Sequence, residues 1–224
     1  MNNITKELNG KKCILFGVND FVGKNLLDHL SKANIGVGLI DIDAKKFDTN
    51  LLYKTVIPRN EESFKKAISE IVDTLGEPDF LLLSYYFDEK VKFSLENPDL
   101  KKWDVILKNW VDSYFLMAKN TIPFLLKNGS GRIMFINTVA GYTGEKENVG
   151  TITGNFSIYE SVASSAITGV MTSMARQIIP LGISVNGVAI GSNYAEDLPR
   201  INWAMDLWLS GMCEYACGQI IRLY

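Results

Sequence analysis

Two glycines, Gly17 and Gly23, follow an apolar run that begins at Lys12. Between a strand and a helix, glycines at such positions let the backbone approach a pyrophosphate closely and aim the helix N-terminus at it. The middle glycine of the usual pattern is missing, because Asp20 or Phe21 stands there, depending on the alignment. A carboxylate at position 20 would repel the phosphates. The segment is therefore interpreted either as a phosphate-binding turn or as a connection whose glycines serve packing alone.

An acidic residue, Asp41, ends the second apolar run, about 20 residues beyond the glycine turn. In dinucleotide-binding folds a carboxylate at this place accepts hydrogen bonds from the adenosine ribose and favours NAD over NADP. Gly17, Gly23 and Asp41 are therefore the predicted cofactor-binding residues. The predicted cofactor is NAD or NADP, with NAD favoured, and the alternative is that the chain binds neither.

Short apolar runs alternate with helical patterns along the chain, and these elements must position the turn. The runs predict buried strands at 12–17, 35–40, 51–57, 80–83, 133–138, 183–190 and 219–223. Apolar residues at helical spacing predict helices at 22–30, 61–75, 103–126, 157–180 and 201–209. Apolar strands that alternate with helices predict an α/β fold with a doubly wound, parallel, seven-stranded Rossmann-type sheet. No repeat or linker divides the chain, so we expect a single domain over residues 1–224.

Composition excludes several classes of function. The 224 residues are 47% hydrophobic and 21% charged, with a net charge of −2, which argues against nucleic-acid or anionic membrane-surface binding. No apolar run reaches the ~20 residues that a bilayer span needs, and the first residues lack a signal-peptide pattern. One histidine and three cysteines without metal spacing predict no metal site. We expect a cytoplasmic protein.

Taken together, the ordered motifs resemble the short-chain dehydrogenase/reductase family over almost the whole chain. The motifs beyond the glycine turn are Trp103-Asp104 at the start of a long helix, Gly131-Arg132-Ile133, Thr138-Val139-Ala140-Gly141, Gly182-Ile183-Ser184-Val185-Asn186 and Gly218-Gln219-Ile220. The resemblance implies binding of NAD or NADP and hydride transfer to or from a carbonyl or alcohol carbon. In the family a tyrosine acts as general acid/base beside a lysine, a serine orients the substrate oxygen, and a helix asparagine holds a relay water.

Carried over to this chain, the resemblance gives Thr138 and Tyr159 as the candidate catalytic residues. The tyrosine position falls on Glu160 instead if the helix is aligned from its other end. The lysine position falls on Ala163 or Ser164, and no lysine follows Lys146. A phenol with an ordinary pKa near 10 is a poor base at neutral pH without a fixed positive charge beside it.

Further departures concern the asparagine position and two loops. The asparagine position falls on Trp110, and the segment usually reading Asn-Asn-Ala-Gly reads Ser84-Tyr85-Tyr86-Phe87. The loop between Thr138 and Tyr159 is longer than in relatives, and the substrate lid after Gly191 is shorter. A lid excludes water and completes the site.

Two functions follow from this pattern. The first is a family member in which ordinary hydride transfer is lost or rewired, so that it serves as a non-redox enzyme, a ligand-binding protein or a partner subunit. The alternative is an active NAD(P)-dependent oxidoreductase that uses Tyr159 and Thr138, with Lys146 supplying charge. The small residues of the helix after Ser157 predict close helix packing, and relatives dimerise there. We therefore expect a homo-oligomer or a hetero-oligomer with a related reductase.

Overall fold

A computed structural model describes residues 7–42, 51–84, 99–143, 158–191, 194–213 and 215–223. Seven strands form one sheet: β1 (Lys12–Phe16), β2 (Gly36–Ile42), β3 (Tyr53–Val56), β4 (Phe80–Leu83), β5 (Gly131–Thr138), β6 (Ile183–Ile190) and β7 (Ile220–Arg222). The α-helices are α2 (Phe21–Lys32), α3 (Glu61–Leu75), α4 (Leu100–Ile106), α5 (Ser113–Lys127), α6 (Ala140–Thr143), α7 (Ile158–Ile178) and α8 (Tyr194–Leu209). The shorter helical turns are η1 (Leu107–Asp112), η2 (Ile179–Leu181) and η3 (Gly211–Cys213).

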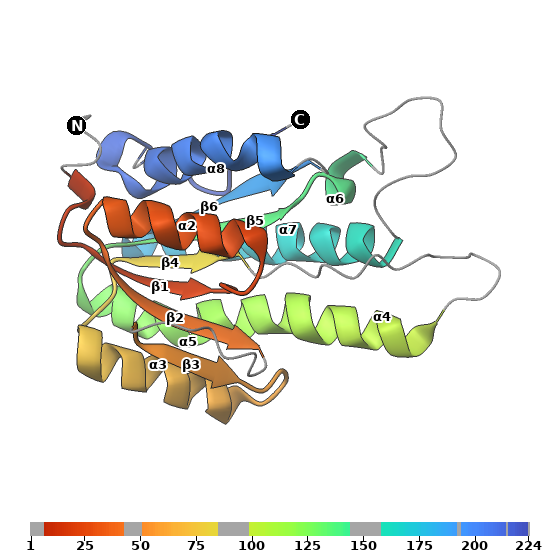
Figure 1. The fold of residues 1–224 in the computed structure, drawn as a ribbon, viewed down its shortest axis with the longest axis horizontal. Helices are drawn as coiled ribbons and strands as arrows, with labels where there is room; N and C mark the ends of the chain where they lie inside the picture. Colours follow the sequence, from red (N-terminus) through yellow and green to blue (C-terminus); the bar gives the residue numbers. More distant parts are fainter. Residues whose placement is uncertain are drawn as a thin grey trace.

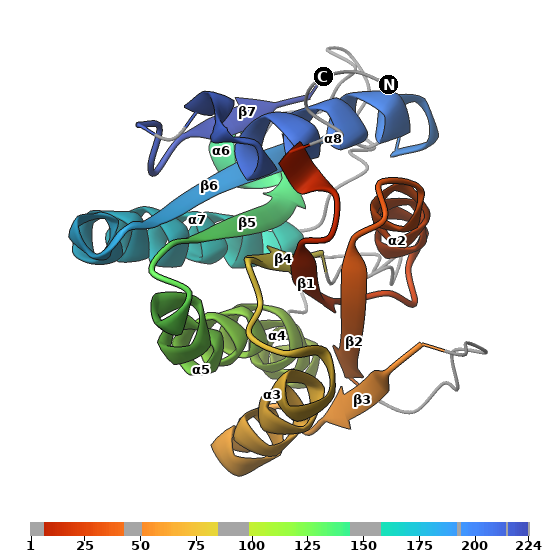
Figure 2. The same cartoon turned by 90° about the vertical axis from the view of Figure 1, so that its left-hand side faces the viewer.

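The sheet is parallel throughout, with strand order β3-β2-β1-β4-β5-β6-β7. Helices cover both faces: α3, α5 and α7 lie on one side, and α2 and α8 on the other (Figures 1 and 2). Each face has its own cluster of buried side chains. The predicted doubly wound, seven-stranded Rossmann-type sheet is therefore confirmed. Its strand order reverses between β1 and β4, and in such sheets ligands bind beyond the carboxyl ends of the strands at this point.

Local signals in the sequence explain several boundaries. Asn60, just before the helix predicted from residue 61, is a residue type that favours helix caps, and its side chain caps α3 by accepting a hydrogen bond from the backbone N–H of Ser63. Such a cap contributes about 1 kcal/mol. The helix predicted at 201–209 begins earlier, at Tyr194, and contains Pro199. Among its described side chains, Leu198 is partly buried against the core and Ile201 is the first that is fully buried, which matches the later part that periodicity marks.

The long helix predicted from Trp103 begins at Leu100 and changes form on the way. Its middle part, η1, is a π-helix that contains the fully buried Trp110, and it joins α4 to α5. π-helical turns within α-helices are frequent at functional sites. Here the turn lies at the position that the resemblance gives to the family's asparagine. Together with the start of α7, α4 projects beyond the carboxyl ends of the strands (Figure 1).

Candidate active site

The glycine turn between β1 and α2 is fixed by backbone geometry. Gly17 has a φ of +86°, in the left-handed region that favours glycine, and its N–H donates to the carbonyl oxygen of Ile40 at 2.9 Å. A Cβ on Gly23 would lie 1.9 Å from the carbonyl oxygen of Gly17. The first turn of α2 therefore packs directly on the end of β1, as the glycine pattern indicates. Binding of a cofactor by these two residues stays a prediction.

Asp41 holds this turn from the neighbouring strand. Its Oδ2 accepts hydrogen bonds from the backbone N–H groups of Val18 at 2.9 Å and Asn19 at 3.0 Å, and its Oδ1 accepts from Ile42 at 2.7 Å. Burial raises the pKa of Asp41, although these hydrogen bonds act in the opposite direction. The carboxylate predicted to bind a ribose thus already accepts hydrogen bonds from the protein backbone. A ribose contact would have to use its remaining lone pairs.

Asp20 occupies the N-terminus of α2. It is the N-cap residue, and its Oδ1 accepts a hydrogen bond from the backbone N–H of Gly23 at 2.6 Å. That N–H belongs to the group of free helix-end donors that a pyrophosphate uses in dinucleotide-binding folds. Gly17 and Gly23 form a cradle for a close phosphate, whereas the Asp20 carboxylate lies at its anion position. The backbone of the turn therefore fits the dinucleotide, and Asp20 opposes it.

Thr138 ends β5 with its side chain fully buried. Its Oγ1 has no hydrogen-bond partner within the described part of the chain, while its carbonyl oxygen accepts from the Ser164 hydroxyl of α7 at 2.6 Å. Ser164 is one of the two positions to which the family's lysine aligns. Burying a hydroxyl without a hydrogen-bond partner is unfavourable, and a hydrogen bond to a ligand oxygen could offset this cost. That Thr138 orients a substrate stays a prediction.

Tyr159 lies against α4 rather than on Thr138. Its ring packs edge-to-face on Trp103, with the centroids 6.0 Å apart, and it is 3% exposed. Its hydroxyl accepts from the backbone N–H of Asp99 at 2.9 Å and lies 3.3 Å from the Asp99 carbonyl oxygen, to which it can donate. Because the Thr138 Oγ1 has no partner, the two predicted catalytic hydroxyls are not hydrogen-bonded to each other. Their catalytic roles stay predictions.

One helical turn after Tyr159, the side chain of α7 lies in the hydrophobic core. Ala163 is fully buried and belongs to the same apolar cluster as Tyr159 and Trp110. Ala163, one of the two positions to which the family's lysine aligns, and Trp110, at the asparagine position, are therefore both packed in the apolar core. Lys146, Ser157 and residues 85–98, which include Tyr85, lie outside the described residues.

Sequence reasoning missed a polar group on the α7 side of β5. The Asn137 amide donates to the Thr168 hydroxyl at 3.0 Å, and it lies 3.3 Å from the Tyr142 hydroxyl. The hydroxyls of Tyr142 and Thr168 are 2.6 Å apart, and the Arg222 guanidinium lies over the Tyr142 ring. The available signal was the alternation of strand side chains, which puts Asn137 and Thr138 on opposite faces.

A second group missed from the sequence joins two strand ends. The Tyr114 hydroxyl lies 2.8 Å from the carbonyl oxygen of Leu83 and 2.7 Å from that of Ile136. The Ser84 hydroxyl donates to the carbonyl oxygen of Gly17 at 2.6 Å, which ties the end of β4 to the glycine turn. These contacts hold the carboxyl edges of β1, β4 and β5 together.

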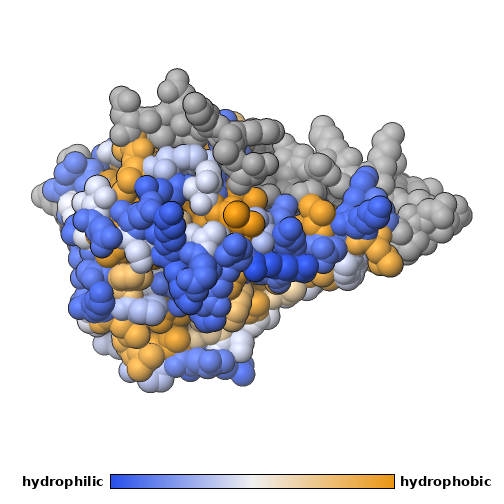
Figure 3. All heavy atoms as spheres, turned by 90° about the horizontal axis from the view of Figure 1, so that it is seen from below, coloured by the Kyte–Doolittle hydropathy of each residue, from blue (hydrophilic) through white to orange (hydrophobic). Residues whose placement is uncertain are grey.

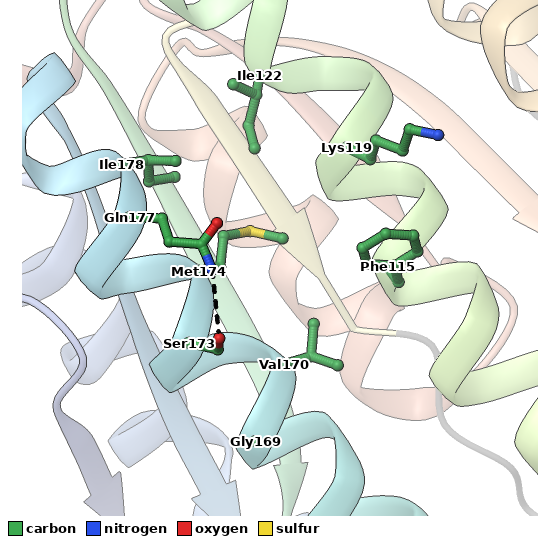
Figure 4. Close-up of a pocket in the computed structure, with 9 residues that line it drawn as sticks. All are labelled: Phe115, Lys119, Ile122, Gly169, Val170, Ser173, Met174, Gln177 and Ile178. Atoms are coloured by element: carbon green, nitrogen blue, oxygen red, sulfur yellow. Dashed lines mark hydrogen bonds between the residues drawn. The ribbon is translucent and has the colours of Figure 1, made fainter.

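Outside this edge, α5 and α7 enclose an apolar groove of about 490 Å³. Figure 4 shows its lining side chains, with Phe115 and Ile122 on α5 across from Val170 and Met174 on α7, and with the Lys119 amine directed away from α7. Figure 3, a space-filling view from below, shows patches of apolar surface between hydrophilic side chains. Phe115 is 46% exposed, which is high for a phenylalanine.

Among the described residues, no group of three or more histidine, cysteine, aspartate or glutamate side chains could hold a metal ion. None of the helices within the described ranges combines the length and apolar character that crossing a bilayer requires.

The fold and the glycine turn define a protein of the dinucleotide-binding α/β class, and comparisons with known proteins narrow the class to a family. A family model described as enoyl-(acyl carrier protein) reductase matches residues 44–199. The chain belongs to the short-chain dehydrogenase/reductase family. It is 27% identical over 206 residues to a 3-oxoacyl-(acyl-carrier-protein) reductase of Buchnera aphidicola, covering 88% of this chain and 80% of that protein.

Solved structures show the same fold. A short-chain dehydrogenase from Leptospira borgpetersenii with bound NAD+ superimposes with a TM-score of 0.82 at 17% identity, covering 99% of this chain and 94% of that one. An L-sorbose reductase from Gluconobacter frateurii, complexed with NADPH and L-sorbose, gives a TM-score of 0.79 at 13% identity, covering 96% and 95%. The two neighbours hold different nicotinamide dinucleotides, so they give no preference between NAD and NADP.

Proposed function

We propose that this chain is an oxidoreductase that uses NAD or NADP to interconvert a carbonyl and an alcohol. The observation that carries the proposal is the Thr138 hydroxyl, which is buried and without a partner at the carboxyl end of β5. It lies on the same sheet edge as the glycine turn, where ligands of such folds bind. The family and the reductase names among its relatives support the same function.

In this proposal each residue has a defined task. The backbone of Gly17 and Gly23 would hold the dinucleotide phosphates, and Asp41 the ribose, which favours NAD. The bound nicotinamide group would supply or accept the hydride. The Thr138 hydroxyl would donate a hydrogen bond to the substrate oxygen, and the Tyr159 hydroxyl would transfer the proton after leaving Asp99. Because position 163 holds a buried alanine rather than a lysine, we expect this proton transfer to be slow.

A second candidate function, without hydride transfer, is favoured by Tyr159 itself. Its hydroxyl already bonds to Asp99, and its ring packs on Trp103. Trp110 and Ala163 fill the positions of two functional family residues. In this case the tyrosine is a structural residue that anchors the start of α4 to α7, and the protein binds a ligand or a partner.

Titration of NADH and NADPH into the full chain, followed by calorimetry, tests the first function. Binding at micromolar to millimolar concentration supports it, and the absence of binding for both overturns it. Oxidation of bound NADH with acetoacetyl-coenzyme A, a 3-oxoacyl thioester, then tests turnover. Thr138→Ala should abolish turnover while leaving NADH binding unchanged. Binding without any turnover, in wild type and variants alike, supports the second candidate.

We also propose that two copies of this chain associate through the groove between α5 and α7. The groove is apolar, and Gly169 and Ser173 on α7 allow a second helix to approach closely. Val170→Asp would place a charge in this interface, whereas Arg200→Asp on the distant helix α8 is the control. Light scattering should show a dimer for the wild type and the control and a monomer for Val170→Asp. A wild-type monomer at all concentrations would contradict this association.

A further inference from the structure

One carboxylate stands at the place where the proposed cofactor would put its phosphates. Gly17 and Gly23 approach so closely that a Cβ on Gly23 would overlap the Gly17 carbonyl oxygen. In dinucleotide-binding folds a turn of this kind lets the phosphates approach the start of the helix, and in this chain the Asp20 carboxylate caps that helix start. It accepts the hydrogen bond of the Gly23 N–H at 2.6 Å.

The neighbouring donors of the turn are engaged as well. The N–H groups of Val18 and Asn19 donate to Asp41, which is 1% exposed. The turn offers three N–H donors, from Val18, Asn19 and Gly23. The first two bond to the buried Asp41 carboxylate, which cannot move away without unfolding the turn. The third donates to Asp20, which is only partly buried. Asp20 is therefore the residue that a phosphate would displace.

We propose that Asp20 is an internal competitor of the dinucleotide phosphates and sets the affinity of the site. The proposal rests on the proposed function, because it concerns the same cofactor site. A bound phosphate must displace the carboxylate from Gly23 and then remain close to its negative charge. This competition lowers the affinity for ligands that place a phosphate at this turn, and it leaves the affinity for a nucleoside without phosphate unchanged. Because the Asp20 carboxylate already interacts with the dipole of α2, replacing it by a phosphate adds no favourable helix-dipole interaction.

Two substitutions separate the charge from the hydrogen bond. Asp20→Asn keeps a side chain that caps helices as well as aspartate does, so α2 should remain folded, but it removes the charge. Asp20→Gly places a glycine at one of the two positions to which the middle glycine of the usual pattern aligns, and glycine is nearly as good an N-cap residue. The control is Asp28→Asn, which removes one negative charge from the exposed side of the same helix, where Asp28 pairs with Lys32.

The experiment measures dissociation constants of NADH and of adenosine by calorimetry for the wild type and the three variants. We expect Asp20→Asn and Asp20→Gly to bind NADH at least about tenfold more tightly than the wild type, because a like charge a few ångströms away is removed. Adenosine affinity should not change, and Asp28→Asn should match the wild type for both ligands. Added salt should narrow the difference between Asp20→Asn and the wild type.

The failures of the two proposals differ. If the wild type binds NADH and the Asp20 variants bind it no better, Asp20 is not a competitor, and the proposed function stands. If adenosine gains as much as NADH, the effect is on the folding of the turn and the inference is overturned. If neither the wild type nor either Asp20 variant binds NADH, the proposed function and this inference both fail. Circular dichroism shows that each variant is folded.

Discussion

The hydroxyl of Tyr159 accepts a hydrogen bond from the backbone N–H of Asp99 at 2.9 Å. Asp99 is the N-cap residue of α4, and its own side chain accepts from the backbone N–H of Lys101. The contact therefore joins the first residues of α7 to the first residues of α4, beyond the ends of the strands. A tyrosine that acts as acid/base in the family is here part of the connection between two helices.

Tyr159→Phe should destabilise the fold even if Tyr159 takes no part in catalysis. The substitution leaves the Asp99 N–H without this acceptor, which should lower the free energy of unfolding by about 1–2 kcal/mol. Urea denaturation measures the change. Tyr215→Phe is the matched control, because Tyr215 is 94% exposed, and its free energy of unfolding should stay at the wild-type value. An unaltered midpoint for Tyr159→Phe would show that the hydroxyl does not stabilise this junction.

Gly23→Ala should be strongly destabilising, because the new Cβ would lie 1.9 Å from the Gly17 carbonyl oxygen. Neither backbone can move without separating α2 from β1, so we expect a loss of at least about 3 kcal/mol. Gly169→Ala is the control on α7 and is compared in the Val170→Asp background, where the groove is expected to be free of a second copy; within one chain its Cβ meets no atom within 4 Å. It should stabilise the protein by about 0.5–1 kcal/mol. Thermal unfolding of the two variants should therefore shift in opposite directions.

Features that depend on neighbouring residues were accessible from the sequence. The Asn60 cap and the glycine turn each need only a few consecutive residues, and the apolar strands follow from their composition. The capping role of Asp20 was equally readable, since aspartate just before a helical pattern is a standard start signal. The glycine pattern of a phosphate turn concerns backbone approach alone and carries no information about which side chain caps the helix.

Features that depend on distant packing were not accessible. Periodicity places Tyr159 at the start of a helix, but the direction of its hydroxyl depends on where α4 begins, at Leu100. The contact of the Ser164 hydroxyl with the Thr138 carbonyl oxygen depends on how α7 rests on the end of β5. Asp41 has the residue type of a ribose ligand, yet its hydrogen bonds to the glycine turn appear only when β2 lies beside β1.

Ala163→Lys should not recover the family's acid/base pair. Ala163 is fully buried in an apolar cluster, and burying an ammonium group there should lower the free energy of unfolding by at least about 3 kcal/mol. Ser165→Lys is the control, because Ser165 is exposed on the same helix, and its effect should stay within about 1 kcal/mol. Chemical denaturation compares the two. A stable Ala163→Lys variant with faster NADH oxidation would instead reveal a vacated lysine site.

Asp41 should make the stability of the protein depend on pH in a direction unusual for a carboxylate. Burial raises its pKa in the folded protein above the ordinary value of 3.8, so the folded chain holds a proton that the unfolded chain has already released. The contribution of this group to stability is therefore fully present below pH 3.8 and is lost as the pH rises through the folded pKa.

Asp41→Asn removes this titration and adds a constant cost: with the amide oxygen facing Val18 and Asn19, the NH2 group takes the place of Oδ1 and cannot accept the hydrogen bond from Ile42. The free energy of unfolding of the variant, taken relative to the wild type, should therefore rise from pH 3.8 up to the folded pKa and be level above it. Urea denaturation of both proteins at matched pH values gives this difference. A relative stability that falls over the same interval would mean that the hydrogen bonds from Val18 and Asn19 outweigh burial, and that the carboxylate is held ionised in the turn.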